Sequence, residues 1–304
     1  MTQNRLSSVR KSVIRYKERK YMNLTNIGNV KEILGRHGFS FSKGLGQNFI
    51  INPDICPRIA ENGNAREGYG ILEIGTGIGV LTAELAKRAD KVTAVEIDTR
   101  LLPILDETLA EFDNVKIINE DVMKCDLGRI IAEEFAGLKI AVCANLPYYI
   151  TSPVIMLLLE SRLPIESITV MVQKEASQRL CAKVGTRESG AITVGVNYFG
   201  TAKSLFNVSR GSFMPAPNVD SAVIRIDVNK EQRLSQEEEK FFFSVVKCGF
   251  SQRRKTVANA LSSQMGIEKQ RVYDALKALG LSESARIEQL DMEQLIAFTK
   301  ALRA

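Results

Sequence analysis

The hydrophobic pattern of the chain indicates two kinds of element between residues 70 and 226. Short apolar runs alternate there with segments whose apolar positions recur every three or four residues. Short runs are typical of buried strands, and the longer period is typical of helices. We predict strands at 71–74, 92–95, 115–118, 140–142 and 168–172, and helices through 81–86, 101–109, 130–135, 152–159 and 175–183. This alternation predicts parallel βαβ units in a Rossmann-like α/β sheet.

The pattern changes after residue 190. Two further apolar runs, at 191–199 and 221–228, are interpreted as strands of an antiparallel sheet edge. The polar run 229–239 then marks a boundary, and beyond it the pattern is only helical. We therefore expect a Rossmann-like domain at 25–229 and a small helical C-terminal domain at 233–304.

The composition is that of an ordinary soluble protein. Of the 304 residues, 45% are hydrophobic and 25% are charged, which is enough to bury a sizeable core. No apolar run reaches the roughly 18 residues of a membrane span, and the N-terminus shows no apolar leader segment. The five cysteines are widely spaced, so we interpret them as reduced thiols rather than as disulfides or metal ligands. We therefore expect a cytoplasmic protein with no membrane anchor and no metal.

The net charge of +6 is typical of a nucleic-acid-binding protein, but it is unevenly distributed. Residues 1–21 contain seven Lys or Arg and one acidic residue, which accounts for the whole excess. We interpret residues 1–24 either as a basic arm, disordered outside the fold, or as an artefact of the assigned start, with Met22 as the alternative start. An argument for nucleic-acid binding must therefore rest on local basic clusters.

A glycine-rich loop follows the first predicted strand in the stretch ILEIGTGIGVLT (71–82) and contains Gly75, Gly77 and Gly79. Glycines let a backbone approach a ligand closely. Glu96 ends the next predicted strand, where an acidic residue can hold a ribose diol. Asp121 follows the third strand, where it could accept a hydrogen bond from an adenine amino group. The alternative for each carboxylate alone is a solvated strand end.

The spacing of this loop favours one kind of nucleotide. A dinucleotide site needs G-x-G-x-x-G to place a pyrophosphate at a helix N-terminus, whereas this loop reads G-x-G-x-G. Glu73 precedes the loop, and we expect its carboxylate to disfavour a diphosphate and to tolerate a sulfonium cation. S-adenosylmethionine has an adenine, a ribose, a positive sulfur and no phosphate. It is therefore the predicted cofactor.

The stretch CANLPYYITSP (143–153) ends the fourth predicted strand with an amide, a proline and two aromatic residues. An aromatic exocyclic amine is a poor nucleophile, but two hydrogen-bond acceptors can hold its protons and direct its lone pair at a methyl group. Asn145 could supply a side-chain carbonyl and Leu146 a backbone carbonyl, whose direction Pro147 restricts. Tyr148 offers a face on which a base can stack. The stretch therefore predicts methylation of a base amine without a strong general base, with a structural turn as the alternative.

The chain resembles the KsgA/RsmA-type small-subunit rRNA adenine dimethyltransferases, and the wider group that includes the Erm methyltransferases. Besides the two stretches above, the resemblance rests on KGLGQNFI (43–50), TAVEID (93–98), INEDV (118–122), MVQKEASQRL (171–180), FMPAPNVDSAVIR (213–225) and FSQRRKTVANAL (250–261). It runs from about residue 25 to the C-terminus in the family's order. Thr76 stands where many members have proline, and we expect only a small change of the loop.

The resemblance implies that the chain dimethylates the N6 amino groups of two adjacent adenosines in the 3′-terminal hairpin loop of 16S rRNA, within an immature 30S subunit. It implies cofactor contacts from Gln47, Asn48, Ile50, Gly75, Gly77, Glu96, Asp121, Val122 and Asn145. The catalytic target-amine motif corresponds to Asn145, Leu146, Pro147 and Tyr148. Phe213 corresponds to the aromatic residue that covers the other face of the base. We expect the protein to be a monomer.

Local basic clusters supply candidate RNA contacts. An enzyme that extrudes a base into a pocket must hold the neighbouring backbone with Lys and Arg. The candidates are Arg253, Arg254 and Lys255, at the start of a predicted C-terminal helix. A second set comprises Lys174, Arg179, Lys183 and Arg187. Acidic residues interrupt this second set, so a solvated helix face is left open as its explanation.

Three other functions are considered. An Erm-like 23S rRNA methyltransferase is disfavoured by the extended match and by the RRKT-containing C-terminal segment. A ribosome-assembly factor with dispensable activity is disfavoured by the intact NLPY stretch, although a dual role stays open. A nicotinamide-dependent oxidoreductase is disfavoured by the loop spacing and by the lack of a site that could handle a hydride.

Overall fold

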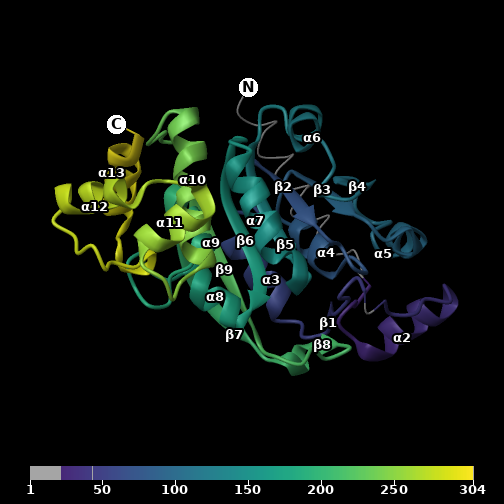
Figure 1. Cartoon of the computed structure of the whole chain (residues 1–304). Coiled ribbons are helices and arrows are strands. Elements are labelled where there is room, and N and C mark those ends of the chain that lie inside the picture. The colour runs from purple at the N-terminus through teal and green to yellow at the C-terminus, as the bar shows by residue number, and fades with distance from the viewer. Residues whose placement is uncertain (1–21, 43, 304) are drawn as a thin grey trace.

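The computed structural model describes residues 22–42 and 44–303, so residues 1–21 of the predicted N-terminal arm lie outside it. Seven strands form one sheet in the order β4-β3-β2-β5-β6-β9-β7 (Figure 1). Their bounds are β2 (Tyr69–Ile74), β3 (Lys91–Glu96), β4 (Val115–Asn119), β5 (Lys139–Asn145), β6 (Ile165–Gln173), β7 (Gly200–Val208) and β9 (Ser221–Val228). The first five are parallel to one another, and β9 runs antiparallel to both of its neighbours, β6 and β7. The strand order reverses between β2 and β5, where such sheets bind ligands at their carboxyl ends.

Helices cover both faces of this sheet, as the alternating apolar pattern predicts. One hydrophobic cluster joins a face of the sheet to α2 (Ile27–Arg36), α3 (Ile55–Asn62), α4 (Val80–Ala86) and α5 (Leu102–Thr108). The opposite cluster contains α6 (Leu127–Glu134), α7 (Thr151–Glu160), α8 (Lys174–Leu180) and α9 (Ala191–Phe199). Ile71 belongs to the first cluster and Leu72 to the second, because successive side chains of a strand point to opposite faces. The Rossmann-like fold is therefore confirmed.

The strand predicted at 191–199 is wrong, because these residues form the helix α9, and the edge strand β7 follows it. Six of the nine residues of α9 are buried, including Val194, Val196 and Phe199. A helix that is buried nearly all round shows no amphipathic period, so its apolar run cannot be told from a buried strand by pattern alone. β7 was not predicted, because most of its residues are partly or fully exposed and form no apolar run.

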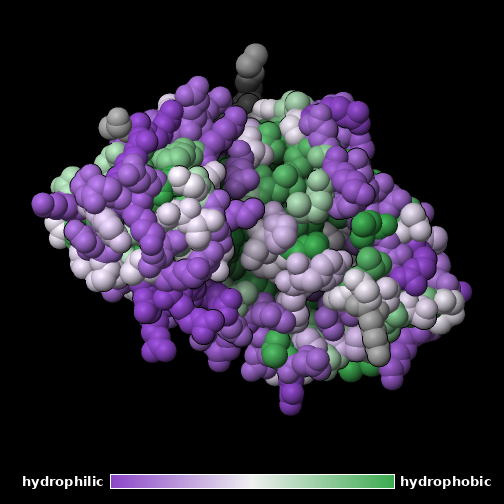
Figure 2. All heavy atoms as spheres, in the orientation of Figure 1, coloured by the Kyte–Doolittle hydropathy of each residue, from purple (hydrophilic) through white to green (hydrophobic). Residues whose placement is uncertain are grey.

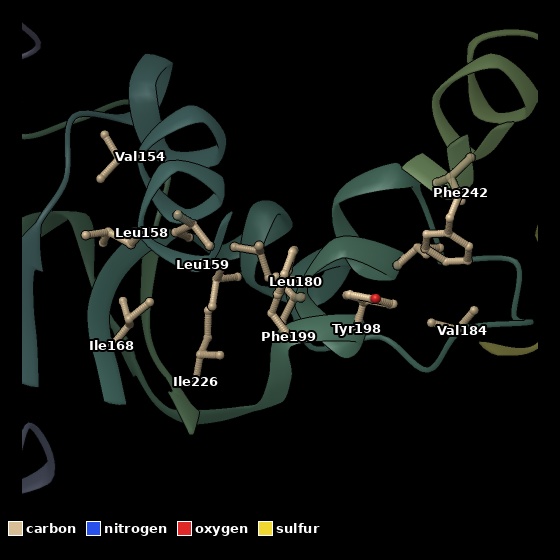
Figure 3. Packing of buried hydrophobic residues seen from close by; sticks show 14 of the residues in the cluster. Val154, Leu158, Leu159, Ile168, Leu180, Val184, Tyr198, Phe199, Ile226 and Phe242 are labelled. Atoms are coloured by element: carbon tan, nitrogen blue, oxygen red, sulfur yellow. The ribbon is translucent and has the colours of Figure 1, made fainter. Parts of the chain in front are cut away.

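Only helices follow β9 in the described part of the chain: α10 (Gln236–Ser251), α11 (Val257–Met265), α12 (Lys269–Ala278), the short 3-10 helix η4 (Ile287–Gln289) and α13 (Met292–Arg303). Ser235 and Glu238 form a capping box that begins α10. Figure 3 shows Phe242 of α10 near Tyr198 of α9, and the two ring centroids are 5.2 Å apart. One hydrophobic cluster continues from the sheet into these helices. An independent domain at 233–304 therefore stays a prediction.

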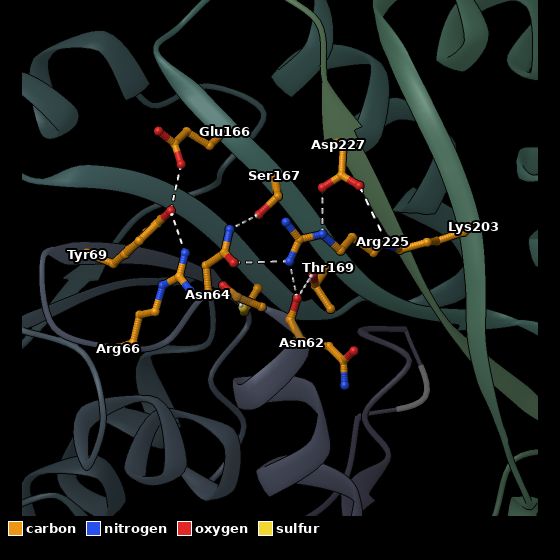
Figure 4. A network of polar contacts seen from close by, with 12 residues as sticks. Asn62, Asn64, Arg66, Tyr69, Glu166, Ser167, Thr169, Lys203, Arg225 and Asp227 are labelled. Atoms are coloured by element: carbon orange, nitrogen blue, oxygen red, sulfur yellow. Dashed lines mark hydrogen bonds and ion pairs between the residues drawn. The ribbon is translucent and has the colours of Figure 1, made fainter.

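A polar network fixes the segment that leads into β2 (Figure 4). Arg225 on β9 donates to the carbonyl oxygen of Asn62, and its Nε lies 2.6 Å from a carboxylate oxygen of Asp227. Asn64 donates its side-chain amide to the hydroxyl of Ser167 on β6, over 2.9 Å. The loop between α3 and β2 is thus bonded to two other strands, which sets the position of β2 in the sheet.

Glu73 on β2 is enclosed in the core and does not line the pocket at the strand ends, so the expectation that its carboxylate disfavours a diphosphate and tolerates a sulfonium cation is wrong. Its side chain is fully buried, and neither carboxyl oxygen has a hydrogen-bond partner among the described residues. Burial raises the pKa of Glu73 from 4.5 to about 8; the nearby Thr82 hydroxyl lowers this pKa, and the carboxylate of Glu96 raises it. Glu73 is therefore protonated in the folded protein at neutral pH.

We expect Glu73→Gln to flatten the dependence of stability on pH. Below pH 4.5 the carboxyl is protonated in both the folded and the unfolded state, and its contribution is complete. As the pH rises towards 8, the unfolded carboxyl ionises while the folded one keeps its proton, so stability is lost by up to about 1.4 kcal/mol per pH unit. Urea unfolding of both proteins across this range measures the difference. Equal pH slopes would show that Glu73 ionises normally.

Candidate active site

Eleven of the predicted site residues line one pocket at the carboxyl ends of the central strands. They are Gln47, Asn48, Ile50, Gly75, Gly77, Glu96, Asn145, Leu146, Pro147, Tyr148 and Phe213. The pocket lies beside the ends of β2, β3 and β5, where the strand order reverses. None of the described residues that line it is basic.

A small second sheet brings distant parts of the chain to this pocket. β1 (Phe49–Ile50) pairs with β8 (Phe213–Met214), so that Ile50 lies opposite Phe213 (Figure 1). Phe213 is buried, and its neighbour Ser212 accepts a hydrogen bond from the backbone N–H of Ile51 over 2.9 Å. The pairing therefore holds the QNFI segment and the predicted base-covering aromatic residue on one side of the pocket.

The glycine-rich loop leaves room for a ligand at Gly75. Gly75 has a φ of 76°, and a Cβ built on it would meet nothing within 4 Å. At Gly77, with a φ of 55°, a Cβ would lie 3.1 Å from the ring of Phe49. Glycine is therefore required for backbone conformation at both positions, and it additionally leaves open space at Gly75 and permits close packing at Gly77.

The Glu96 carboxylate is held in a fixed orientation by its neighbours. One oxygen accepts from the backbone N–H of Thr76 over 2.9 Å and from the Thr76 hydroxyl over 3.0 Å. The other accepts from the backbone N–H of Asp98 over 2.8 Å. Glu96 is buried and lines the pocket, so it is an oriented acceptor of the kind that holds a ribose diol. Thr76 thus contributes two donors, which its sequence context did not indicate.

Asp98 and Arg100 were missed by sequence reasoning, yet they hold Gln47 against the pocket. The side-chain amide of Gln47 donates to Asp98 over 2.7 Å and accepts from the backbone N–H of Ser42 over 2.8 Å. Arg100 bonds the same carboxylate through Nε over 2.8 Å and lowers the pKa of Asp98. An acidic and a basic residue directly after a strand, in EIDTR, were the only signal in the sequence.

The Asn145 side chain is oriented by a backbone carbonyl. Its Nδ2 donates to the carbonyl oxygen of Asn48 over 3.2 Å. A carbonyl can only accept, so the nitrogen of the amide must face Asn48, and Oδ1 takes the remaining direction. Asn145 ends β5 and lines the pocket, so a side-chain carbonyl oxygen is available there as an acceptor.

Tyr148 closes the same end of the pocket. It lies in a short 3-10 turn after Pro147, whose carbonyl oxygen accepts from the backbone N–H of Ile150 over 3.1 Å. Its hydroxyl is 2.8 Å from the hydroxyl of Ser221 at the start of β9. Burial raises the pKa of Tyr148, so the phenol stays neutral. The hydrogen bond between the two hydroxyls therefore holds the Tyr148 ring in place.

Five predicted residues do not line the pocket. Asp121 accepts from the backbone N–H of Met123 over 3.0 Å, and Val122 is buried in the core. The other three, Arg253, Arg254 and Lys255, are exposed in the turn between α10 and α11, so they precede the helix at whose start they were predicted. Arg253 donates to the carbonyl oxygen of Arg187 over 2.8 Å, which joins this basic cluster to the segment after α8.

The described part of the chain has no group of three or more His, Cys, Asp or Glu residues placed to bind a metal ion. No described helix has both the length and the apolar character that crossing a membrane requires.

Comparison with known proteins identifies the family. The family described as ribosomal RNA adenine dimethylase matches residues 38–303. A protein of Geobacillus thermodenitrificans named "Ribosomal RNA small subunit methyltransferase A" is 49% identical over 279 residues, which are 90% of this chain and 95% of that protein. A protein of the same name from Alkaliphilus oremlandii is 46% identical and covers 87% of this chain and 92% of its own.

Two solved structures have a similar fold. The 23S rRNA methyltransferase ErmE is 28% identical, with a TM-score of 0.65, and covers 84% of this chain and 100% of its own. A dimethyladenosine transferase from Plasmodium falciparum is 24% identical, with a TM-score of 0.69 over 82% of this chain and 95% of its own, and supports the fold alone. The open space at Gly75 and the oriented Glu96 carboxylate fit S-adenosylmethionine. The chain therefore belongs to the ribosomal RNA adenine dimethylase family, and it is an S-adenosylmethionine-dependent rRNA methyltransferase.

Proposed function

We propose that the protein dimethylates the N6 amino groups of two adjacent adenosines in the 3′-terminal hairpin loop of 16S rRNA, within an immature 30S subunit. The observation that carries this proposal is the orientation of the Asn145 amide by the Asn48 carbonyl, which directs a side-chain oxygen at the pocket. The protein acts in the cytoplasm as a monomer.

The residues of the pocket divide into two groups in this proposal. S-adenosylmethionine supplies an electrophilic methyl group when it is bound. Glu96 holds its ribose, the backbone at Gly75 and Gly77 approaches it closely, and Gln47, Asn48 and Ile50 complete its site in the pocket. Asp121 and Val122, which follow β4 outside this pocket, are assigned to the adenine end of the cofactor. The target adenine enters beside Asn145. Because Tyr148 and Phe213 both line the pocket, they supply the aromatic faces between which the base is held.

The chemistry assigned to the NLPY stretch is orientation of the amine. The Asn145 Oδ1 and the Leu146 carbonyl oxygen each accept a hydrogen bond from one N6–H, and Pro147 fixes the direction of the Leu146 carbonyl. These bonds favour a pyramidal nitrogen whose lone pair points at the methyl group. The methylated amine becomes acidic as it forms, so no strong general base is needed. Positioning in a pocket that excludes water supplies the rate enhancement.

The choice of the small-subunit RNA is supported by the relatives. The proteins that are 46–49% identical are named as small-subunit methyltransferases, whereas the 23S methyltransferase ErmE is 28% identical. The exposed residues Arg253, Arg254 and Lys255 hold the RNA backbone on the helical side of the molecule. Cells that lack the gene should have unmethylated adenosines in this hairpin loop of 16S rRNA, which mass spectrometry of the excised fragment detects. Loss of methylation only in 23S rRNA would refute the proposal.

We expect Asn145→Ala to reduce single-turnover methylation of small-subunit particles by on the order of a hundred- to a thousand-fold at saturating cofactor, as for other preorganised donors and acceptors at a reaction centre. RNA affinity should change little, because the contact strengthens mainly in the transition state. Cofactor affinity is measured in parallel. Tyr148→Ala should differ by also weakening RNA capture, because it removes a stacking face. A rate for Asn145→Ala within a few-fold of wild type would make NLPY a structural turn.

We expect Thr76→Val to weaken S-adenosylmethionine binding by about 1.5–3 kcal/mol, because it removes a hydrogen bond to the buried Glu96 carboxylate. Thr93→Val is the matched control, since Thr93 lies on the same strand as Glu96 and its buried hydroxyl has no hydrogen-bond partner within the described ranges 22–42 and 44–303. Calorimetry of both variants measures the affinities. Equal affinities for the two variants would mean that the Thr76 hydroxyl does not orient Glu96.

We expect Arg254→Glu to weaken binding of small-subunit particles and to reduce the log–log salt slope of binding by roughly one or more, because a phosphate contact is lost. Affinity for S-adenosylmethionine should not change, because Arg254 does not line the cofactor pocket. Lys277→Glu makes the same charge change at another exposed position and serves as the control. Should both variants show the wild-type slope, the basic cluster would be a solvated surface.

A further inference from the structure

A second groove lies beside the cofactor pocket, at the carboxyl end of β6. The residues that form it come from three segments of the chain, and two of them are acidic: Gln173, Lys174, Glu175, Gln178, Arg210, Asn218, Val219 and Asp220. None of these residues lines the cofactor pocket or belongs to the Arg253–Lys255 cluster. Figure 2 shows hydrophilic side chains gathered over α8, the helix that begins at this groove.

The groove and the pocket share a wall. The Tyr148 hydroxyl, which belongs to the pocket, is 2.8 Å from the hydroxyl of Ser221. Ser221 lies opposite Gln173 in the pairing of β9 with β6. The preceding residue, Asp220, accepts from the backbone N–H of Lys174 over 3.0 Å. The groove therefore begins directly behind the residue on which the target base is proposed to stack.

The position of Arg210 is fixed relative to the pocket as well. Its backbone N–H donates to the Asp220 carboxylate over 3.0 Å. At the other end of the same short turn, the carbonyl oxygen of Ser212 accepts from Ile51 over 2.9 Å. Phe213, which lines the pocket, follows immediately. Hydrogen bonds at both ends of the turn that contains Arg210 thus fix its backbone position.

The cationic side chains of the groove are available to a ligand. In the part of the chain that the structure describes, neither Lys174 nor Arg210 forms an ion pair. The two carboxylates that also line the groove have partners of their own: Glu175 is paired with Arg179 over 2.5 Å, and Asp220 accepts from the backbone N–H of Arg210 over 3.0 Å. Two Gln residues and one Asn add hydrogen-bonding groups, and Val219 is 44% exposed. Cations together with side-chain amides and a small apolar surface are typical of sites that contact the phosphate and sugar of a nucleic acid.

We propose that this groove binds the phosphate and sugar of the nucleotide that adjoins the target adenosine. The inference rests on the proposed function, since a base can enter the pocket only if its own backbone passes the pocket mouth. A solvated helix face explains these residues less well, because they converge from the start of α8, from the turn before β8 and from the segment before β9. The groove makes no base-specific contact. It sets the position of the RNA strand, so that the target base reaches Asn145.

The test uses the double variant Lys174→Gln/Arg210→Gln in the full-length protein, with small-subunit particles that lack the methylation as substrate. The control is Lys269→Gln/Arg271→Gln, which removes the same charge from exposed residues around the start of α12. Steady-state methylation gives KM for the particles and kcat, particle binding at several salt concentrations gives the salt slope, and calorimetry gives the affinity for S-adenosylmethionine. Both variants change only exposed side chains, and cofactor affinity reports whether each remains folded.

We expect the groove variant to raise KM for the particles by about tenfold or more, because hydrogen bonds from charged groups each contribute about that factor. Its log–log salt slope should fall by roughly two relative to wild type, while cofactor affinity stays unchanged. The control should match wild type in all three measurements. The inference is overturned if the groove variant has the KM and salt slope of the control, or if it loses cofactor affinity. A wild-type protein that does not methylate the particles would instead refute the proposed function.

Discussion

The hydrogen bond from the Asn145 amide to the Asn48 carbonyl is the constraint on which the site depends. It joins the end of a central strand to the segment that enters the small β1–β8 sheet. It also decides which atom of the amide faces the pocket, because a backbone carbonyl accepts only a donor. The proposed cofactor contacts and target-amine contacts therefore come from segments that hold each other in place. A single donor–acceptor pair thus couples the two halves of the proposed reaction.

The other side chains of the pocket are likewise oriented by hydrogen bonds to neighbouring residues. Glu96 is oriented by Thr76 and by the backbone of Asp98, and the Asp98 side chain in turn holds Gln47. Tyr148 is held through Ser221. Side chains fixed in this way need little reorganisation when charge shifts during methyl transfer, which is how preorganised sites lower a barrier. A parallel sheet suits this purpose, because its strands end at one edge and bring these residues together.

The sequence predicted most of the sheet and the pocket, because strand ends and glycine spacing are local features. Eleven predicted site residues meet in one pocket, although Asn48 and Phe213 are far apart in the chain. The errors have physical causes. The helix α9 is buried nearly all round, so its pattern resembles a strand. Glu73 was predicted to lie next to a ligand because it precedes the glycine-rich loop. Position in the sequence does not show whether such a side chain faces the ligand or the core, and Glu73 faces the core. Thr76 and Asp98 act through tertiary contacts, which no local pattern contains.

The central claim is that Asn145 presents a carbonyl oxygen to the N6 amine of adenine. The measurement that tests it most directly is a crystal structure of the protein with S-adenosylhomocysteine and an RNA that carries the target adenosines. The account predicts that the adenine N6 lies within about 3.2 Å of both Asn145 Oδ1 and the Leu146 carbonyl oxygen, with the Asn145 amide nitrogen still on the Asn48 carbonyl. An N6 that is bonded to other groups, or an Asn145 amide that has turned its nitrogen to the base, would contradict it.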